Sequence, residues 1–431
     1  MNHLPPEWNS DRLKDVAAIN ATSLPANTDP DYEFDYLEIS NVDYYGVVDP
    51  KAIERLRYED APSRARRRVA KDSTVISSVR PNLQAVAFMP DAGEHFVCST
   101  GFNVVQSHEA KLMPKFAYYS LISEAARQYF EAAAKGVGYP AVDDKDFNSF
   151  TVPLPPLPEQ KHIVAYLDAS CAAIDAAVGS KRHQLETLDA LIRETIHRIV
   201  TQGLDPRVAV KSSGLDWLPH VPEHWQVRQI KRRCALLRGK FSHRPRNDPA
   251  LYDGQYPFVQ TGDVTAAQKY IRSYSQTLNE LGFSVSKMFP KGTLVMSIAA
   301  NVGDVAILDF EACFPDSMVG LVPDHQTSLD FLYYLMRAMK GILLRSAVLT
   351  TQLNLNYVRI GTNFAPFPPK EEQEEIARFL DEKIQDVLTI KDTLNKQIEI
   401  LIAYRKSLIY ECVTAHRRVT ENDIKHVHIY A

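Results

Sequence analysis

The chain of 431 residues is long enough for about three domains, and its hydrophobic fraction of 45% supports buried cores without a metal or disulfide framework. Its charged fraction of 24%, with 17 Gly and 26 Pro, excludes a disordered, collagen-like or low-complexity protein. The formal net charge of −4 excludes a protein that coats nucleic acid through general positive charge. Any contact with DNA must therefore depend on local basic clusters.

The cysteines and the N-terminal residues indicate in which cellular compartment the protein is found. Five cysteines stand singly, which favours free thiols in a reducing environment. The opening residues, MNHLPPEWNSDRLKD, lack the apolar core of a signal peptide. No run approaches the roughly 18 apolar residues of a membrane span. We therefore expect a cytoplasmic protein with no membrane contact. The cysteines are Cys98, Cys171, Cys234, Cys313 and Cys412.

Residues 1–153 predict a globular α+β region. Short runs rich in Val and Ile, bounded by turn residues, are typical of strands. Between 115 and 135, Phe116, Tyr119 and Phe130 share one face, which predicts a single helix. The predicted strands are 36–39, 75–79, 86–88 and 104–105.

A long helix is predicted at 154–203, after a proline-rich start. Apolar residues recur there at alternating steps of three and four, which is the seam of a coiled coil. Gly203 provides the C-terminal stop. The stretch runs without proline for about 43 residues, on the order of 60 Å. The seam residues are Ile163, Leu167, Cys171, Ile174, Val178, Leu185, Leu188, Ile192 and Ile199.

After a linker at 204–221, the second half of the chain follows the same plan. Residues 222–366 predict strands at 294–298 and 305–308 and a helix at 329–344, and a tail follows at 416–431. Two matched seams in one chain favour helices that pack on each other, and the alternative is a helix buried in a globular core. The second long helix, 367–415, has the seam residues Ile376, Leu380, Ile384, Val387, Leu394, Ile398, Leu401 and Leu408.

The two halves are copies of one unit. Residues 155–168 match 368–381 without a gap, so that Glu372 follows Glu159 by 213 residues. Upstream, the matches continue with drifting offsets, as loops of different length would produce. The chain is therefore a globular region and a helix, used twice. The upstream pairs are 75–79 with 294–298, 116–119 with 331–334, and Trp8 with Trp225.

The sequence lacks the motifs of several common catalytic sites. The chain has no phosphate-binding P-loop and no Asn/Asp-Pro-Pro-aromatic motif of an adenine methyltransferase. The nearest Pro-Pro sequences, at 4–7 and 367–370, lack the polar residue. The turn at 136–141 formally resembles a dinucleotide loop, but it follows a helix and carries Pro140. Their absence points to a binding or scaffold role.

Two further groups have simple structural interpretations. His426 and His428 could bind a metal, but no carboxylate or Cys lies at a ligand spacing, so we interpret them as part of a frayed tail. The acidic run at 143–146 is interpreted as a solvated helix start.

Positive charge gathers in two clusters, one in each half. Such clusters suit contacts with DNA phosphates, and the alternative is a solvated surface run. The first cluster consists of Arg64, Arg66, Arg67 and Arg68, with Lys71. The second extends from 228 to 246 without an acidic residue and contains Arg228, Lys231, Arg232, Arg233, Arg238, Lys240, Arg244 and Arg246.

Polar side chains in loops are candidates for reading bases. Arg can pair bidentately with guanine, and Asn or Gln with adenine. Each is also an ordinary turn residue, and that alternative stays open. The candidates are Arg80, Asn82 and Gln84 after the 75–79 strand, Asn301 after the 294–298 strand, and Gln352 and Asn354 in the polar stretch 350–354.

These features together resemble the specificity (S, HsdS) subunit of type I restriction-modification systems. The resemblance rests on Leu-Pro-Pro-Leu-Pro-Glu-Gln at 154–160 with its helix, and on Phe-Pro-Pro at 367–369 followed by Glu-Gln at 372–373. It rests also on the junction, Gly-Leu-Asp-Trp-Leu-Pro at 214–219. It covers almost the whole chain. The N-terminus departs from the pattern, because it keeps Leu-Pro-Pro-Glu-Trp but lacks Gly-x-x-Trp-Leu.

The resemblance implies a division of labour. Each globular region would be a target recognition domain that reads one half of a bipartite site in double-stranded DNA. The helices would form an antiparallel coiled coil that sets the half-site spacing and docks two methyltransferase (M) subunits, which restriction (R) subunits then join. This chain would be non-catalytic and without a cofactor, and S-adenosylmethionine, ATP and Mg would act in the partner subunits during DNA methylation and phage defence.

Two other functions stay open at this point. One is a self-contained methyltransferase or nuclease, against which the missing motifs argue. The other is a coiled-coil scaffold without DNA contact, which would need none of the clustered arginines.

Overall fold

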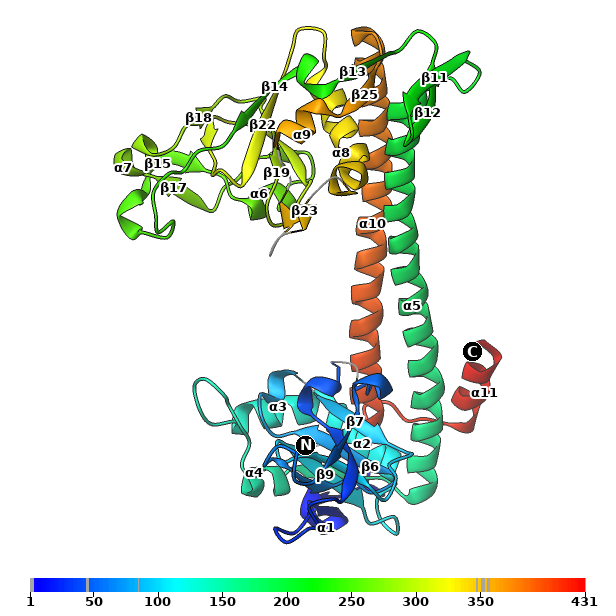
Figure 1. Ribbon diagram of the computed structural model, residues 1–431. Helices are drawn as coiled ribbons and strands as arrows, with labels where there is room; N and C mark the ends of the chain where they lie inside the picture. The colour runs from blue at the N-terminus through cyan, green and yellow to red at the C-terminus, as the bar shows by residue number, and fades with distance from the viewer. Residues whose placement is uncertain are drawn as a thin grey trace. The chain divides into compact units, whose positions relative to one another are not determined.

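The computed structural model describes residues 4–43, 46–83, 85–345, 348–349, 353–354 and 357–430. The chain divides into two compact units, and both long helices contribute to each of them. Unit 1 comprises Met1–Arg182 and Asn395–Ala431, and unit 2 comprises His183–Leu394. The predicted boundaries at 153 and 366 fall instead where a globular region meets its helix, and they stay predictions. The long helices are α5 (Leu157–Gln202) and α10 (Lys370–Val413) (Figure 1).

Two four-stranded sheets form the globular part of unit 1. The first, in the order β2-β9-β6-β7, is antiparallel throughout, and its strand β6 is buried at every residue. The second, β4-β3-β8-β5, has a parallel pair at its centre. The separate pair β1–β10 joins the start of the region to the strand that leads into α5. The strands are β1 (Asn9–Arg12), β2 (Ala17–Ile19), β3 (Glu33–Leu37), β4 (Glu54–Arg57), β5 (Ala65–Arg68), β6 (Ser73–Ser77), β7 (Val86–Met89), β8 (Phe96–Ser99), β9 (Phe102–Ser107) and β10 (Thr151–Leu154).

Short helices connect these strands. The α-helices are α1 (Leu13–Val16), α2 (Pro114–Ile122), α3 (Glu124–Ala133) and α4 (Asp144–Asn148), and the 3-10 turns are η1 (Ile39–Asn41), η2 (Pro50–Ala52) and η3 (Pro81–Leu83). The apolar core lies between the sheets and includes Leu37, Val75, Ala87, Cys98 and Phe102.

Unit 2 has a five-stranded sheet, β14-β22-β19-β20-β16, and a four-stranded sheet, β17-β15-β21-β18. The pair β13–β25 has the same role as β1–β10, since β25 leads into α10. The strands are β11 (Val210–Leu215), β12 (Leu218–Pro222), β13 (Gln226–Gln229), β14 (Cys234–Arg238), β15 (Tyr252–Phe258), β16 (Tyr270–Ile271), β17 (Gln276–Leu278), β18 (Met288–Phe289), β19 (Leu294–Ser297), β20 (Val305–Leu308), β21 (Ala312–Cys313), β22 (Met318–Pro323), β23 (Val348–Leu349), β24 (Leu353–Asn354) and β25 (Phe364–Phe367).

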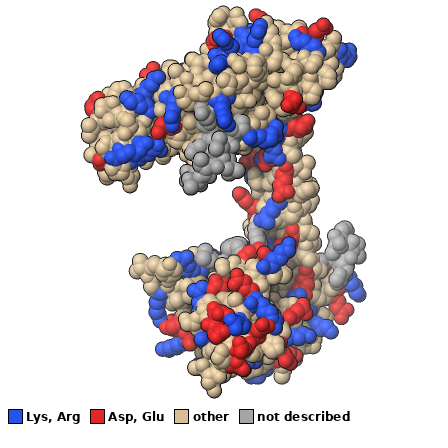
Figure 2. Space-filling model, in the orientation of Figure 1, with Lys and Arg blue, Asp and Glu red and all other residues tan. Residues whose placement is uncertain are grey.

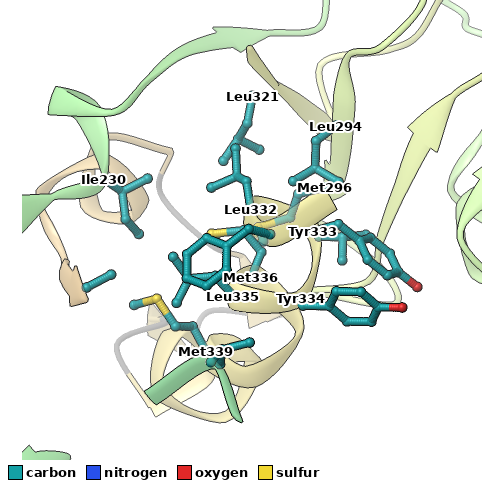
Figure 3. Packing of buried hydrophobic residues seen from close by; sticks show 14 of the residues in the cluster. Ile230, Leu294, Met296, Leu321, Leu332, Tyr333, Tyr334, Leu335, Met336 and Met339 are labelled. Atoms are coloured by element: carbon teal, nitrogen blue, oxygen red, sulfur yellow. The ribbon is translucent and has the colours of Figure 1, made fainter. Parts of the chain in front are cut away.

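Helix α8 covers the larger sheet of unit 2. Its Leu332 and Met336 lie in one buried cluster with Leu294 and Met296 of β19 and Leu321 of β22 (Figure 3). Residues from the ends of α5 and α10 belong to the same cluster, so the helix pair is part of the core. The helices of unit 2 are η4 (Ile230–Arg232), η5 (Pro249–Leu251), α6 (Thr261–Ala266), α7 (Glu280–Ser284), α8 (Leu329–Arg345) and α9 (Tyr357–Thr362).

A fully buried glutamine fixes the start of α5 to the globular part of unit 1. Gln160 accepts a hydrogen bond from the Met113 N–H at 2.8 Å. Its amide group donates to the carbonyls of Lys111 (2.8 Å) and Pro155 (2.9 Å). Gln160 is 0% exposed, so its own amide group finds its hydrogen-bond partners in these three backbone groups and not in water.

Unit 2 repeats this junction at the start of α10. Gln373, also 0% exposed, accepts from the Ser328 N–H at 2.8 Å. It donates to the carbonyls of Gln326 (3.2 Å) and Pro368 (2.8 Å). The sequence repeat is therefore also a repeat of hydrogen bonds.

A tryptophan and a glutamate form the second part of each junction. The indole Nε1 of Trp8 donates to Glu159 at 3.0 Å, and that of Trp225 donates to Glu372 at 3.0 Å. Both carboxylates lie in the first turn of a long helix, where the helix dipole favours negative charge. Arg418, from the segment after α10, also pairs with Glu159 at 2.9 Å.

An aspartate two turns further along each helix forms the third part. The Tyr119 hydroxyl donates to Asp168 at 2.6 Å, and the Tyr334 hydroxyl donates to Asp381 at 2.5 Å. Burial and the adjacent carboxylate raise the pKa of both tyrosines, so each hydroxyl stays a donor at neutral pH. Each carboxylate also pairs with a lysine, Lys115 or Lys269.

Most predicted elements are confirmed. The α+β class, the strands within 75–79, 86–88, 104–105, 294–298 and 305–308, and helix 329–344 are present as β6, β7, β9, β19, β20 and α8. The strand predicted at 36–39 is shifted, because β3 ends at Leu37. Helix α5 ends before Gly203, whose φ of +80° suits a glycine. The long helices have 46 and 44 residues, or about 69 and 66 Å.

The single helix predicted at 115–135 is wrong. The chain forms α2 and α3, which are separated at Ser123. Ser123 has an extended backbone, and its hydroxyl accepts a hydrogen bond from the Ala126 N–H, which caps α3. The periodicity of the apolar face continues across the break, so it did not reveal the break.

The frayed tail is wrong for residues 421–430, which form α11 (Glu421–Tyr430). The Thr420 N–H donates to the Asp423 carboxylate at 2.8 Å, and the Asp423 N–H donates to the Thr420 hydroxyl at 3.4 Å. This capping box starts the helix. The side chains of His426 and His428 lie outside the described residues.

Helix α5 contains a stretch of 18 residues with a mean hydropathy of 1.3, which is long and apolar enough to cross a membrane. The expectation that no stretch approaches this composition is therefore wrong, because many small residues lie between Ile163 and Gly179. The core helix of a soluble protein has the same composition, and 44% of this stretch is buried within the protein.

The buried glutamine gives a stability prediction. Gln160→Leu removes the three hydrogen bonds to these backbone groups, so we expect a loss of about 3 kcal/mol from the stability of unit 1. Faster hydrogen exchange at the Met113 amide and a lower urea midpoint would report it. Gln184→Leu, at an exposed position of the same helix, is the matched control and should change stability by less than about 0.5 kcal/mol. Equal exchange at Met113 in both variants would contradict the assigned role.

Candidate nucleic-acid interface

The first basic cluster lies on strand β5 and its flank. Arg67 points into the protein, where its guanidinium donates to the Phe102 carbonyl and to Asn103 Oδ1. Burial lowers the pKa of Arg67. Arg64 is paired with the carboxylate of Glu38. The structure therefore uses half of this predicted cluster for contacts within the domain.

The other two arginines of the cluster stack on aromatic rings. The Arg66 guanidinium lies 4.6 Å from the centre of the Tyr58 ring, and that of Arg68 lies 5.7 Å from the centre of the Tyr32 ring. Stacking orients a guanidinium without neutralising its charge. Both side chains are partly exposed and keep a positive charge at the surface.

The second cluster contains exposed cations in unit 2. Arg232, at the end of η4, and Lys240, after β14, are exposed and make no ion pair within the part of the chain that the structure describes. Arg233 differs, because its side chain is 12% exposed and lies 3.8 Å from Asp324. Arg232 and Lys240 are thus accessible to an outside ligand, whereas Arg233 forms an ion pair within the protein.

Two further arginines of this cluster share one carboxylate. Arg244 and Arg246 both pair with Asp316, the former at 3.5 Å. Two guanidinium groups on one carboxylate leave a local positive charge. Figure 2 shows Lys and Arg side chains gathered over the lobe of unit 2 that carries β15 and β17, whereas the face drawn for unit 1 mixes both signs.

The candidate base-reading residues of unit 1 lie in a surface turn after β6. Arg80 has a φ of +51°, and its guanidinium stacks 4.4 Å from the centre of the Tyr139 ring. Asn82 follows in η3 and is exposed. Arg80 and Asn82 are thus together at the surface, as predicted, and Gln84 lies outside the described residues.

The corresponding residues of unit 2 are only partly described. Asn301 is exposed and donates to the Thr265 hydroxyl at 2.9 Å, which orients its amide. Gln352 lies outside the described residues. Asn354 is the last residue of β24, and its side chain is likewise outside them.

The predicted seam residues lie along one face of each long helix. In the described helices they are buried or half-buried, and the half-buried ones are Leu185, Leu188, Ile384, Val387 and Leu401. Within unit 1, Arg405 of α10 pairs with Asp175 of α5 at 3.1 Å. All twelve seam positions assigned to the coiled coil are Ile or Leu residues at less than half exposure, as a packed seam requires. They are Ile163, Leu167, Ile174, Leu185, Leu188, Ile192, Ile376, Leu380, Leu394, Ile398, Leu401 and Leu408.

The antiparallel pairing of α5 and α10 follows from the parts of these helices that lie in the same unit. Unit 1 holds the first part of α5 and the last part of α10, and unit 2 holds the opposite parts. In unit 2, Lys391 of α10 pairs with Asp189 of α5. The helices therefore run in opposite directions in each unit.

The described residues hold no group of three or more His, Cys, Asp or Glu that could bind a metal. The acidic run at 143–146 starts α4, with Asp143 capping the Asp146 N–H, as predicted. All five cysteines are free and buried. Burial raises the pKa of Cys98, Cys234 and Cys412 to about 12, which leaves these thiols unsuited to nucleophilic chemistry.

Sequence reasoning missed a groove in unit 2 that is lined by charges of both signs. Its volume is about 490 Å³, and its lining includes Arg193 of α5 and Arg337 and Lys340 of α8, of which Lys340 is paired with Asp304. These residues come from distant parts of the sequence and form no local cluster, so no sequence signal marks the groove. It joins the surface of the helix pair to that of the globular region of unit 2.

Comparisons with known proteins agree on one family. The model of the type I restriction modification DNA specificity domain matches residues 5–187 and 222–400. A putative type I restriction enzyme MjaX specificity subunit of Methanocaldococcus jannaschii is 23% identical over 417 residues, covering 93% of this chain and 92% of that protein. The HindI specificity subunit of Haemophilus influenzae is 20% identical and covers 64% and 71%.

Two solved structures share the fold. A chain from a structure of complex assembly and conformational transition of the type I R-M system has a TM-score of 0.77 and 22% identity, with 96% and 99% of the chains covered. The HsdS subunit of Thermoanaerobacter tengcongensis has a TM-score of 0.53 and 22% identity, with 95% and 97% covered. With two family matches that span both repeats, this chain belongs to the type I restriction-modification DNA specificity family.

Proposed function

We propose that this chain is the DNA sequence-specificity subunit of a type I restriction-modification complex, and that each globular region reads one half of a bipartite site in double-stranded DNA. The observation that carries this proposal is the repeated junction. Gln160 and Gln373 join two different globular regions to two antiparallel helices through the same hydrogen bonds. A chain that presents two recognition surfaces on one frame suits a site with two halves.

Phosphate contacts supply affinity in this account. Arg232 and Lys240 bind phosphates in the second half-site, and the stacked Arg66 and Arg68 bind them in the first. Base contacts come from the surface turn that carries Arg80 and Asn82, and from Asn301. Because the two regions differ in sequence outside the shared frame, they read different half-sites.

The coiled coil fixes the distance between the half-sites. Each long helix is one unbroken element, and its seam is buried against the other helix. A buried seam resists bending, so the spacing of the two DNA halves follows the length of the helices.

The partners follow from the same family. Two methyltransferase (M) subunits dock on the helix pair, and restriction (R) subunits join them. S-adenosylmethionine, ATP and Mg act in these partners, and this chain contributes no catalytic group. The complex works in the cytoplasm, where it methylates DNA and acts in phage defence.

A test of DNA contact uses the exposed cations of unit 2. In the complex with M, the double variant Arg232→Gln, Lys240→Gln should weaken binding to duplex DNA and lower the slope of log K against log salt by about 1.8, or about 0.9 for each lost phosphate contact. Arg198→Gln, at an exposed position of α5 outside both clusters, is the control. Binding that keeps its affinity and slope in the double variant would favour a scaffold without DNA contact.

A test of spacing changes the length of the coiled coil. One helical turn is inserted at Leu188 and matched by one turn beside Lys391, the partner of Asp189. The spacer of the methylated site should change by about one to two base pairs, because a turn rises about 5.4 Å and a base pair about 3.4 Å. Both half-sites should stay the same, and the same insertion in the 204–221 linker should have no effect. An unchanged spacer in the matched variant would refute the role of the helices as a ruler.

A further inference from the structure

The loop between α3 and α4 has a rigid base and a projecting tip (Figure 1). At the base, Lys135 and Ala141 exchange two backbone hydrogen bonds of 2.9 and 3.0 Å. The Arg80 N–H donates to the Pro140 carbonyl at 2.7 Å, which ties the loop to the turn after β6. Gly136, at φ +108°, allows the chain to turn outward. The loop is therefore held in position by the domain.

The tip presents apolar side chains to solvent. Val137 is 105% exposed, more than any other large hydrophobic residue that the structure describes, and Tyr139 is 72% exposed. Neither contributes to a core of unit 1. A fixed loop that holds two apolar side chains away from its own domain indicates a surface that another molecule covers.

The charge beside the tip identifies the partner. Arg80 stacks on Tyr139 and makes no ion pair within the described residues, so its positive charge is available next to the apolar tip. Lys135 is different, because Asp143 and Asp146 neutralise it. A projecting tip with a cation beside an exposed aromatic ring suits a DNA groove, where phosphates flank the base edges. A protein interface would need a much larger area than two side chains offer.

We infer that this loop enters a groove of the duplex, where Val137 and Tyr139 make apolar contacts with bases and Arg80 holds Tyr139 in place. The inference rests on the proposed function and adds a contact of a different kind. Apolar side chains against base steps or thymine methyl groups discriminate between sequences, whereas they release no counterions. The loop therefore contributes specificity at the first half-site.

The test separates apolar contacts from phosphate contacts by their dependence on salt. The chain in complex with M binds duplexes that carry its mapped methylation site or a scrambled first half-site. The double variant Val137→Ser, Tyr139→Ala should bind the intact site about tenfold to a hundredfold more weakly and the scrambled site unchanged, with the same salt slope as the parent. Arg80→Gln removes the stacking that holds Tyr139, so it should likewise weaken binding to the intact site and leave the scrambled site unchanged.

Val210→Ser is the matched control, because Val210 is 61% exposed on β11 and outside both recognition regions. It should change neither affinity nor slope. If the parent binds the site and the loop variant binds it equally well, the inference is wrong and the proposed function stands. A loss that is equal on both duplexes, with a lower slope, would also overturn it. A parent complex that binds no duplex would instead refute the proposed function.

Discussion

The buried glutamine at the head of each long helix is the contact on which the rest of the structure depends. Gln160 and Gln373 are each fully buried, and each forms hydrogen bonds with three backbone groups. Separating the loop from the helix would break all three hydrogen bonds of a buried amide, so the loop is held to the start of the helix. The Trp–Glu and Tyr–Asp pairs add two more contacts within the first turns of the same helix. Each recognition surface is thereby held at a fixed orientation to its own helix.

Positive charge is distributed unevenly between the two units. The net charge of −4 argues against a general affinity for nucleic acid, and the structure shows why local contacts are still available. Several arginines of unit 1 are used inside the domain, among them Arg64 and Arg67. Unit 2 keeps Arg232 and Lys240 exposed. The two halves share one frame, but they present different charged surfaces to a ligand.

Much of this architecture can be predicted from the sequence. The seam, Gly203 and the matched Pro-Pro and Glu-Gln motifs identify the helices and the repeat, because helix periodicity and helix ends depend on local residues. The role of Gln160 could not be predicted, since its partners at 111 and 113 lie almost fifty residues upstream. The break at Ser123 and the capping box at Thr420 carry local signals that apolar periodicity conceals. The inward direction of the Arg67 side chain depends on tertiary packing. It could not be predicted from a sequence in which three arginines stand side by side.

The central claim is that each globular region reads its own half-site. A region that is moved to the other junction should therefore keep its specificity. The most direct measurement is to replace residues 222–366 with a second copy of 5–153, express this chain with its M subunit, and map the methylated adenines. Because the helices run antiparallel, the account predicts an inverted repeat of the first half-site with the original spacer. A site that keeps the original second half, or that loses both halves, would contradict the account.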